Sequence, residues 1–135
     1  MPFRGPIAIA SSAFDAILAH AAATQPEEAC GLLLGGGQRI LEARAAANVV
    51  PDKVRHFEID PQALIDAHRA ERSGGPELIG YYHSHPVGPP EPSATDRASA
   101  ARDGKVWAIA GQGEVRFWRD GPDGFEPLSY MPVEA

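Results

Sequence analysis

A six-residue apolar run closed by three glycines constrains the fold of this chain more than any other feature. The run covers residues 29–34 and the glycines cover residues 35–37. Its length and the glycine stop favour a β-strand over a helix, and its lack of polar alternation indicates burial on both faces. A second buried run covers residues 106–110. Both runs predict strands inside a sheet that other elements cover.

Helices and strands are expected to alternate irregularly along the rest of the chain. A first helix, over residues 12–24, opens on Ser12 and Asp15 as a capping-box pair, and a second begins at the N-cap Asp60 and Pro61. The other expected elements are strands at residues 7–10, 39–46, 57–59, 77–82, 115–118 and 125–130 and a short helix at 93–102. This order indicates an α/β protein with a mixed or antiparallel central sheet flanked by helices, rather than a doubly wound parallel fold.

The length and charge of the chain limit its class. A chain of 135 residues is expected to form one domain, residues 1–135. The formal net charge is −6 and the lysines and arginines are scattered, which argues against a nucleic-acid partner because phosphate binding needs a basic patch. The oligomeric state is not predicted by these features.

The cysteine content and the apolar segments bear on the compartment. Cys30 is the one cysteine, which rules out an intrachain disulfide and fits a reducing cytoplasm, and we expect it to be a small buried side chain. No segment approaches the roughly 18 apolar residues of a membrane span. Residues 1–6 lack the apolar core of a signal peptide. A cytoplasmic location with no membrane partner is expected.

Two histidines and an aspartate have a spacing that suits a catalytic metal. His83 and His85 lie at the end of an expected strand, and residues two apart along a strand point to the same face. Both imidazoles can therefore reach one ion. Asp96, eleven positions after His85, is the natural third ligand of an open zinc site, which takes three protein ligands and a water molecule.

Each half of this pattern also has a purely structural interpretation. Two histidines on a strand can form a polar edge or a hydrogen-bonded core pair. Ser93 and Asp96 match the capping box at the start of a helix, and an aspartate engaged as a cap would not be free to bind a metal. Ser84, between the histidines, turns to the other face of the strand, where we expect it to make a structural hydrogen bond.

Together with a segment far upstream, the pattern resembles a known family. The His-x-His-Pro segment at residues 83–86, followed by Ser93 and Asp96, matches the JAMM (MPN-plus) metalloprotease motif. The segment at residues 28–31 matches the Glu-x-x-Gly setting that precedes an apolar strand in that family. The chain looks like the small stand-alone bacterial members, of the CysO-cysteine peptidase type that processes sulfur carriers. The resemblance, which covers residues 14–110, implies the JAMM/MPN architecture, which is cytidine deaminase-like.

The resemblance implies a role for each matched residue. His83, His85 and Asp96 would ligate one Zn²⁺ ion per chain, with water at the open position and its pKa lowered towards about 7. Glu28 would take the proton from that water and deliver it to the leaving amine. Ser93 would donate a hydrogen bond to the oxyanion that develops on the scissile carbonyl.

Glu27 competes with Glu28 for the role of general base. Motif register favours Glu28, and strand alternation places the two carboxylates on opposite faces. Only one of them is therefore expected to face the metal.

The implied activity is zinc-dependent hydrolysis of an amide bond at the C-terminal glycine of a ubiquitin-like or sulfur-carrier protein that ends in Gly-Gly. An extended carrier tail is expected to add as a strand near the cleft and to contact the loops at residues 48–55 and 87–92. The alternative is a catalytically inactive scaffold or protein-binding module, against which the presence of all five functional residues argues. A zinc deaminase needs a Cys-x-x-Cys pair, which one cysteine cannot supply.

Overall fold

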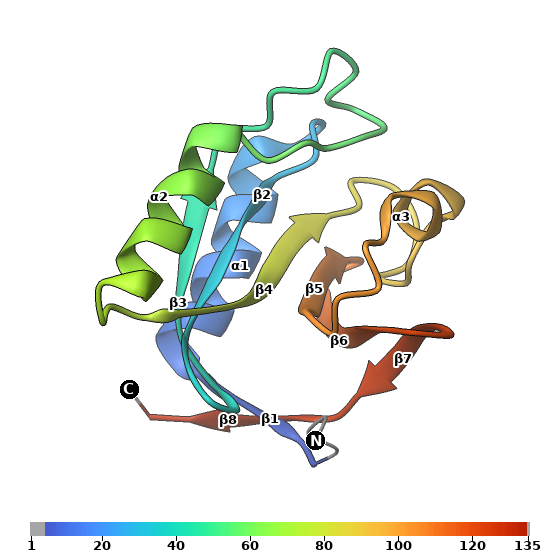
Figure 1. Ribbon diagram of the computed structural model, residues 1–135. Helices are drawn as coiled ribbons and strands as arrows, with labels where there is room; N and C mark the ends of the chain where they lie inside the picture. Colours follow the sequence, from blue (N-terminus) through green and yellow to red (C-terminus); the bar gives the residue numbers. More distant parts are fainter. Residues whose placement is uncertain (1–4, 135) are drawn as a thin grey trace.

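Within residues 5–134, which the computed structural model describes, eight strands form one mixed sheet in the order β7-β6-β5-β4-β2-β3-β1-β8, and three helices pack around it (Figure 1). The elements are β1 (Ile7–Ala10), α1 (Ser11–Thr24), β2 (Cys30–Gly36), β3 (Arg39–Ala46), α2 (Pro61–Arg72), β4 (Glu77–Ser84), α3 (Ala94–Ser99), β5 (Val106–Gly111), β6 (Glu114–Gly121), β7 (Gly124–Leu128) and β8 (Tyr130–Val133). The predicted α/β class with a mixed, helix-flanked sheet is confirmed. None of the helices in this range combines the length and apolarity needed to cross a membrane. The expectation about residues 1–6 falls mainly on residues 1–4, outside the described part.

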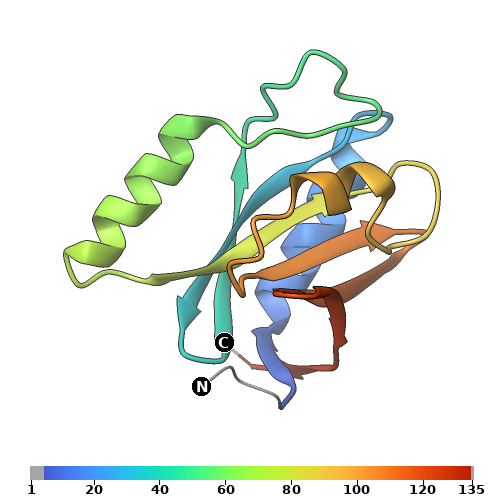
Figure 2. The same ribbon diagram turned by 45° about the vertical axis from the view of Figure 1, so that its right-hand side comes forward.

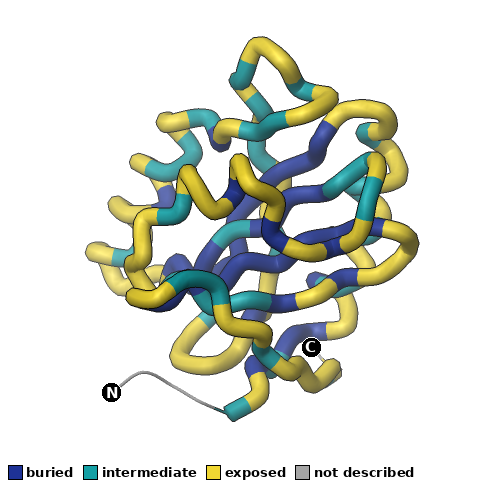
Figure 3. The backbone as a smooth tube through the Cα atoms, turned by 90° about the vertical axis from the view of Figure 1, so that its right-hand side faces the viewer, coloured by how far each residue is buried: buried dark blue, intermediate teal, exposed yellow. Residues whose placement is uncertain are grey.

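Strand β2 lies in the middle of the sheet and is buried on both faces, as its apolar run predicts. It pairs antiparallel with β3 on one side and with β4 on the other. Leu33 belongs to the same apolar cluster as Ile17 of α1, whereas Leu32 belongs to a cluster that contains Ala67 of α2. The two helices therefore cover opposite faces of the sheet (Figures 1 and 2), and the buried residues form a band through its centre (Figure 3).

The central strands are ordered so that β2 begins where β4 and β5 end. We refer to this end of the sheet as the functional edge. In the antiparallel pair of β2 with β4, Cys30 lies opposite His83, and in the parallel pair of β4 with β5, His83 lies opposite Ile109. The residues before β2 and those after β4 therefore meet at this edge, although more than fifty positions separate them. The loop of residues 47–60 and helix α3 rise at the same edge in both ribbon views (Figures 1 and 2).

Several local signals are realised as predicted. The Asp60 side chain accepts a hydrogen bond from the Gln62 N–H at 3.1 Å and Pro61 is the first residue of α2. The expected strands at residues 29–34 and 39–46 correspond to β2 and β3, which form an antiparallel hairpin. Cys30 is buried, with its thiol directed at backbone carbonyls.

The start of α1 and the end of the chain differ from the prediction. Helix α1 begins at Ser11, directly after β1, with no side-chain cap, so the predicted pairing of Ser12 with Asp15 is wrong. The N-cap is Ala10, so Ser12 already lies inside the helix and cannot serve as the capping residue. The strand expected at residues 125–130 is divided at Ser129 into β7 and β8, and β8 pairs in parallel with β1. That partner lies at the other end of the sequence, so no local pattern signals the division.

Residues 57–59 form one isolated bridge rather than a strand. The Asn48 side chain takes over the hydrogen bonds that a strand partner would make: its Oδ1 accepts from the Glu58 N–H at 3.0 Å, and its Nδ2 donates to the His56 carbonyl at 3.1 Å. Nδ2 also donates to the carbonyl of Glu28 at 3.1 Å. One amide therefore closes the loop on itself and attaches it to the start of β2.

Candidate active site

The three residues expected to bind a metal converge at the functional edge. His83 is the penultimate residue of β4, His85 follows the strand, and Asp96 lies in the first turn of α3. The Nε2 atoms of His83 and His85 lie 3.2 Å apart, and Asp96 Oδ2 lies 3.1 Å from the first and 3.2 Å from the second. His83 and Asp96 are buried and His85 is partly exposed. We refer to these residues as the His-His-Asp cluster.

The spacing and chemistry of the cluster fit a metal ion. Imidazole nitrogens and carboxylate oxygens are zinc ligands, and the ligand atoms of a tetrahedral site with bonds of about 2.0–2.1 Å lie about 3.3 Å apart. The three observed separations, 3.1 to 3.2 Å, are close to that value. His85 Nδ1–H donates to the Pro89 carbonyl at 2.8 Å. Because a carbonyl can only accept, the lone pair of the neutral ring lies on Nε2, which faces the cluster.

Asp96 is at once a helix cap and a member of the cluster. Its Oδ2 accepts from the Ser93 backbone N–H at 2.9 Å, and Ser93 Oγ accepts from the Asp96 N–H at 3.0 Å, which completes a capping box. The same Oδ2 faces both imidazoles. The two interpretations of Ser93 and Asp96 are therefore compatible, because a carboxylate oxygen can accept from an N–H and offer a second lone pair to an ion. The Ser93 hydroxyl also keeps its own proton to donate.

The charges in the cluster favour an anionic Asp96. Burial raises the pKa of Asp96, but contacts with His83 and His85 and the Ser93 N–H outweigh burial and hold that pKa well below its usual range. Burial lowers the pKa of His83. Burial also lowers the pKa of His85, but hydrogen bonds to Asp96 and Pro89 outweigh it, so the pKa is raised. Asp96 is therefore ionised near neutral pH, as a metal ligand must be.

Glu28 is held next to the cluster by hydrogen bonds of its own backbone and its neighbour's. Its N–H donates to the Lys53 carbonyl at 2.7 Å and its carbonyl accepts from Asn48. The following residue, Ala29, donates its N–H to Ser84 Oγ at 2.8 Å and accepts from the Ser84 N–H at 3.0 Å. The structural hydrogen bond predicted for Ser84 is confirmed, and it fixes Glu28 relative to the strand that carries the histidines.

The environment of Glu28 suits proton exchange near neutral pH. The residue is 6% exposed, and its burial raises its pKa to about 7. The charges of Asp96 and Asp52 also raise the pKa, and that of His85 opposes them. A carboxyl group with a pKa near the working pH is suited to accept and return a proton. Glu27 is exposed, so the structure brings Glu28 rather than Glu27 to the cluster.

Two cavities adjoin the cluster, and Glu28 and Arg55 border both. The inner cavity has a volume of about 310 Å³, and its wall includes the aromatic residues Phe57, Tyr81 and Trp107 as well as Asp96 and His56. The outer cavity has a volume of about 370 Å³, and the residues that line it with the two shared ones are Val54, His85, Pro86, Val87 and Ser93. A peptide bond at the cluster therefore has space on two sides.

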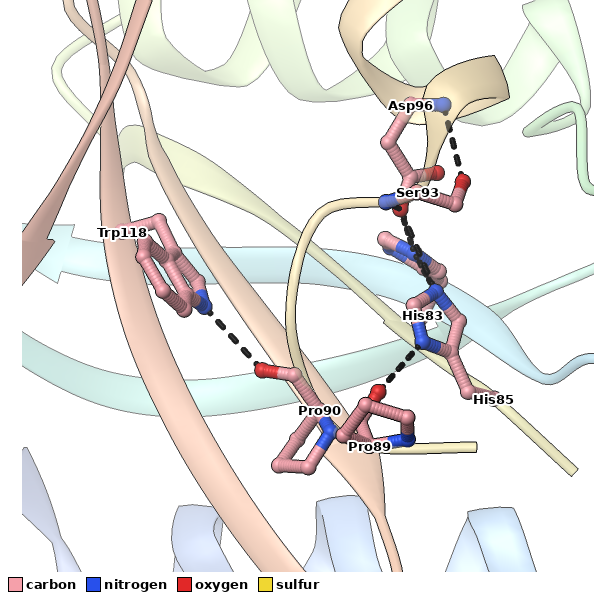
Figure 4. Close-up of polar contacts among 7 residues, drawn as sticks. All are labelled: His83, His85, Pro89, Pro90, Ser93, Asp96 and Trp118. Atoms are coloured by element: carbon pink, nitrogen blue, oxygen red, sulfur yellow. Dashed lines mark hydrogen bonds and ion pairs between the residues drawn. The ribbon is translucent and has the colours of Figure 1, made fainter. Parts of the chain in front are cut away.

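Three aromatic residues that sequence reasoning did not connect to the site lie against His83 or against the loop that follows the histidines. Phe57 stacks on His83, and Trp107 meets the same imidazole edge-on, with ring centroids 5.6 Å apart and planes at 88°. The Trp118 indole N–H donates to the Pro90 carbonyl at 3.2 Å, in the loop that follows the histidines (Figure 4). These contacts join segments far apart in the chain, so no motif spacing signals them.

Comparison with known sequences gives clear relatives. The family model described as prokaryotic homologs of the JAB domain matches residues 10–121. A desampylase of Haloferax volcanii is 37% identical over 109 residues, which cover 76% of this chain and 78% of the relative. A probable TtuB-protein conjugate cleaving protease of Thermus thermophilus is 36% identical over 78 residues, which cover 58% of this chain and 52% of the relative.

Solved structures share the fold. A protein of Desulfitobacterium hafniense, solved in solution, superposes with a TM-score of 0.82 and 28% identity over 96% of this chain and 94% of its own. A structure described as a JAMM metalloprotease-like zinc site in the proteasome and signalosome superposes with a TM-score of 0.63 and 20% identity over 96% of this chain and 99% of its own, which shows likeness of fold.

The mixed sheet, with a His-His-Asp cluster next to a buried glutamate at one edge, defines a domain of the JAMM/MPN class. The chain belongs to the family of prokaryotic JAB-domain homologues. It is a JAMM-type hydrolase, and its desampylase and protease relatives favour this assignment over the alternative of an inactive scaffold.

Proposed function

We propose that this protein is a zinc-dependent isopeptidase that hydrolyses an amide bond at the C-terminal glycine of a ubiquitin-like or sulfur-carrier protein. The observation that carries the proposal is the convergence of three ligand atoms, 3.1 to 3.2 Å apart, beside a buried glutamate whose pKa is raised to about 7. His83, His85 and Asp96 would hold one Zn²⁺ ion. They are the one group of this kind within residues 5–134.

The residues around the cluster suit the steps of amide hydrolysis. A zinc ion held there supplies Lewis-acid chemistry, which activates water at neutral pH and polarises a carbonyl oxygen. Glu28 takes the proton from the attacking water and returns it to the leaving amine, as its raised pKa permits. The Ser93 hydroxyl accepts the helix-capping hydrogen bond and donates a hydrogen bond of its own to the oxyanion that develops on the scissile carbonyl.

The substrate class is supported by the relatives and by the shape of the cleft. The relatives act on protein conjugates, as the names desampylase and TtuB-protein conjugate cleaving protease state. The outer cavity lies between the two loops that are expected to contact the substrate. Val54 and Arg55 line it from the loop of residues 48–55, and Val87 lines it from the loop of residues 87–92. A glycine at the scissile bond suits a site that buried carboxylates enclose, because it brings no side chain. We take residues 1–135 as one catalytic domain, in the cytoplasm.

Mass spectrometry on two substrates tests the proposal. The zinc-loaded protein is incubated with a Gly-Gly-ended carrier joined either to a short C-terminal peptide or to a lysine side chain. We expect one of the adducts, or both, to be released, and Glu28→Ala to abolish release while zinc remains bound. Failure to release either adduct, or release that persists in Glu28→Ala, contradicts the proposal. Zinc that remains after His83, His85 and Asp96 are all replaced by alanine contradicts the ligand assignment.

A further inference from the structure

The orientation of His85 depends on one carbonyl in the loop of residues 86–92. His85 Nδ1–H donates to the Pro89 carbonyl at 2.8 Å, and this hydrogen bond turns Nε2 towards Asp96 and His83 (Figure 4). In metal sites the partner of the second ring nitrogen fixes the tautomer and the orientation of the ligating ring. The position of Pro89 therefore determines whether His85 is ready to bind an ion.

This loop has little means to hold its own shape. Four of its seven residues are prolines, so only Val87, Gly88 and Glu91 retain a backbone N–H. The Glu91 N–H makes a local hydrogen bond to the Pro89 carbonyl at 2.8 Å. The rest of the support has to come from outside the loop.

Two residues of neighbouring strands supply that support. The Trp118 indole N–H, on β6, donates to the Pro90 carbonyl at 3.2 Å. Gly111, the last residue of β5, packs directly under the loop: a Cβ atom there would lie 3.0 Å from the Gly88 carbonyl oxygen and 3.1 Å from the Pro90 nitrogen. The loop is therefore seated on Gly111 and tied by Trp118, immediately next to the carbonyl that orients His85.

We propose that Trp118 is a positioning residue for the metal centre. It holds Pro90, and through the adjacent peptide unit it keeps the Pro89 carbonyl in place to accept from His85 Nδ1–H. It touches neither the substrate nor the ligand atoms. The inference rests on the proposed zinc site, and it extends the functional set to β6, two strands away from the strand that carries the histidines.

Zinc affinity of Trp118→Phe, measured by competition with a chromophoric chelator, tests this role. Loss of a hydrogen-bond partner around a metal ligand typically weakens metal binding by about 10–100-fold, and Trp118 acts one link further away, so we expect a loss of about tenfold. In the zinc-loaded protein, ¹⁵N NMR of the His85 ring is expected to show a weaker or more rapidly exchanging Nδ1–H. Gly111→Ala crowds the same loop from below and is expected to act in the same direction.

Lys105→Met is the matched control. The Lys105 ammonium group donates to the Leu78 carbonyl at 2.9 Å, which is also a side-chain contact to a backbone carbonyl. Its loss is expected to leave zinc affinity and the His85 signal unchanged, whatever it does to stability. Zinc affinity of both Trp118→Phe and Gly111→Ala within twofold of wild type, with an unchanged His85 Nδ1–H signal, overturns the role of Trp118. Absence of zinc binding by the wild-type protein overturns the zinc site itself, so the two failures are distinct.

Discussion

Phe57 lies face to face with His83: the centroids of the two rings are 4.2 Å apart and their planes are inclined by 16°. His83 is completely buried, and its Nδ1 atom has no hydrogen-bond partner among the residues that the structure describes. A metal-ligating histidine usually has such a partner to fix its ring. The ring of His83 instead stacks on Phe57, and the Trp107 ring lies perpendicular to it. The two histidines are therefore oriented by different means, His83 by aromatic packing and His85 by a hydrogen bond.

Replacement of Phe57 is expected to weaken zinc binding by more than the accompanying loss of folding stability explains. Phe57→Leu keeps an apolar side chain but loses the stacked ring, whereas Phe57→Ala also opens a cavity. Because Phe57 is half-buried, we expect Phe57→Ala to lower the free energy of unfolding by about 1–3 kcal/mol. Phe57→Leu is expected to cost less stability and yet to reduce zinc affinity, as measured by chelator competition. Normal zinc affinity in Phe57→Leu contradicts the orienting role.

Replacement of Glu28 is expected to separate catalysis from metal binding. Removal of a general base typically slows a reaction by about 10²–10⁴-fold, so Glu28→Gln should lose most of the cleavage rate and retain zinc. The rate is measured by release of the carrier adduct, and the metal by elemental analysis. Glu27→Gln is the matched control, because Glu27 is the adjacent carboxylate and is exposed. An equal loss in both variants contradicts the assignment of the base to Glu28.

The same residue is expected to destabilise the metal-free protein at alkaline pH. Since burial raises the pKa of Glu28 to about 7, from an ordinary value of 4.5, the folded chain favours the protonated form. Its contribution to stability is complete below about pH 4.5 and is lost as the pH rises through about 7. At pH 8 the free energy of unfolding of metal-free Glu28→Gln should therefore be about 1–3 kcal/mol larger than that of the metal-free wild-type protein. Denaturant unfolding at pH 8 and pH 4.5 measures this, and the difference should vanish at the lower pH.

Much of the fold follows from local patterns, because each local signal has a local physical cause. The apolar run of residues 29–34 predicts β2, and Asp60 with Pro61 predicts the start of α2. The parallel pair of β1 with β8, in contrast, joins the two ends of the chain, and its partners share no recognisable pattern.

The candidate site divides in the same way. The motif indicates the residues that are proposed to carry the chemistry, and the structure brings them together at one edge of the sheet. The motif does not identify what orients them: Phe57 and Trp118 reach the site only through tertiary packing, from segments about thirty positions away in either direction. Sequence reasoning also treated the cap and the ligand roles of Asp96 as rivals, because it had no means to see that one carboxylate oxygen can face both the Ser93 N–H and the two imidazoles.

Ser93 caps α3 and is proposed to stabilise the oxyanion, and one control variant separates the two roles. Ser93→Ala removes the acceptor that caps α3, which should lower the free energy of unfolding by about 1 kcal/mol. It also removes the donor to the oxyanion, which should reduce kcat by about 10²–10³-fold. Asp60→Ala removes the N-cap of α2, which is not part of the His-His-Asp cluster, and should cost a similar amount of stability with no effect on kcat. Both variants are measured by denaturant unfolding and by the rate of adduct release from the zinc-loaded protein. If Ser93→Ala keeps the wild-type kcat, Ser93 is a helix cap alone and the oxyanion is stabilised by other groups.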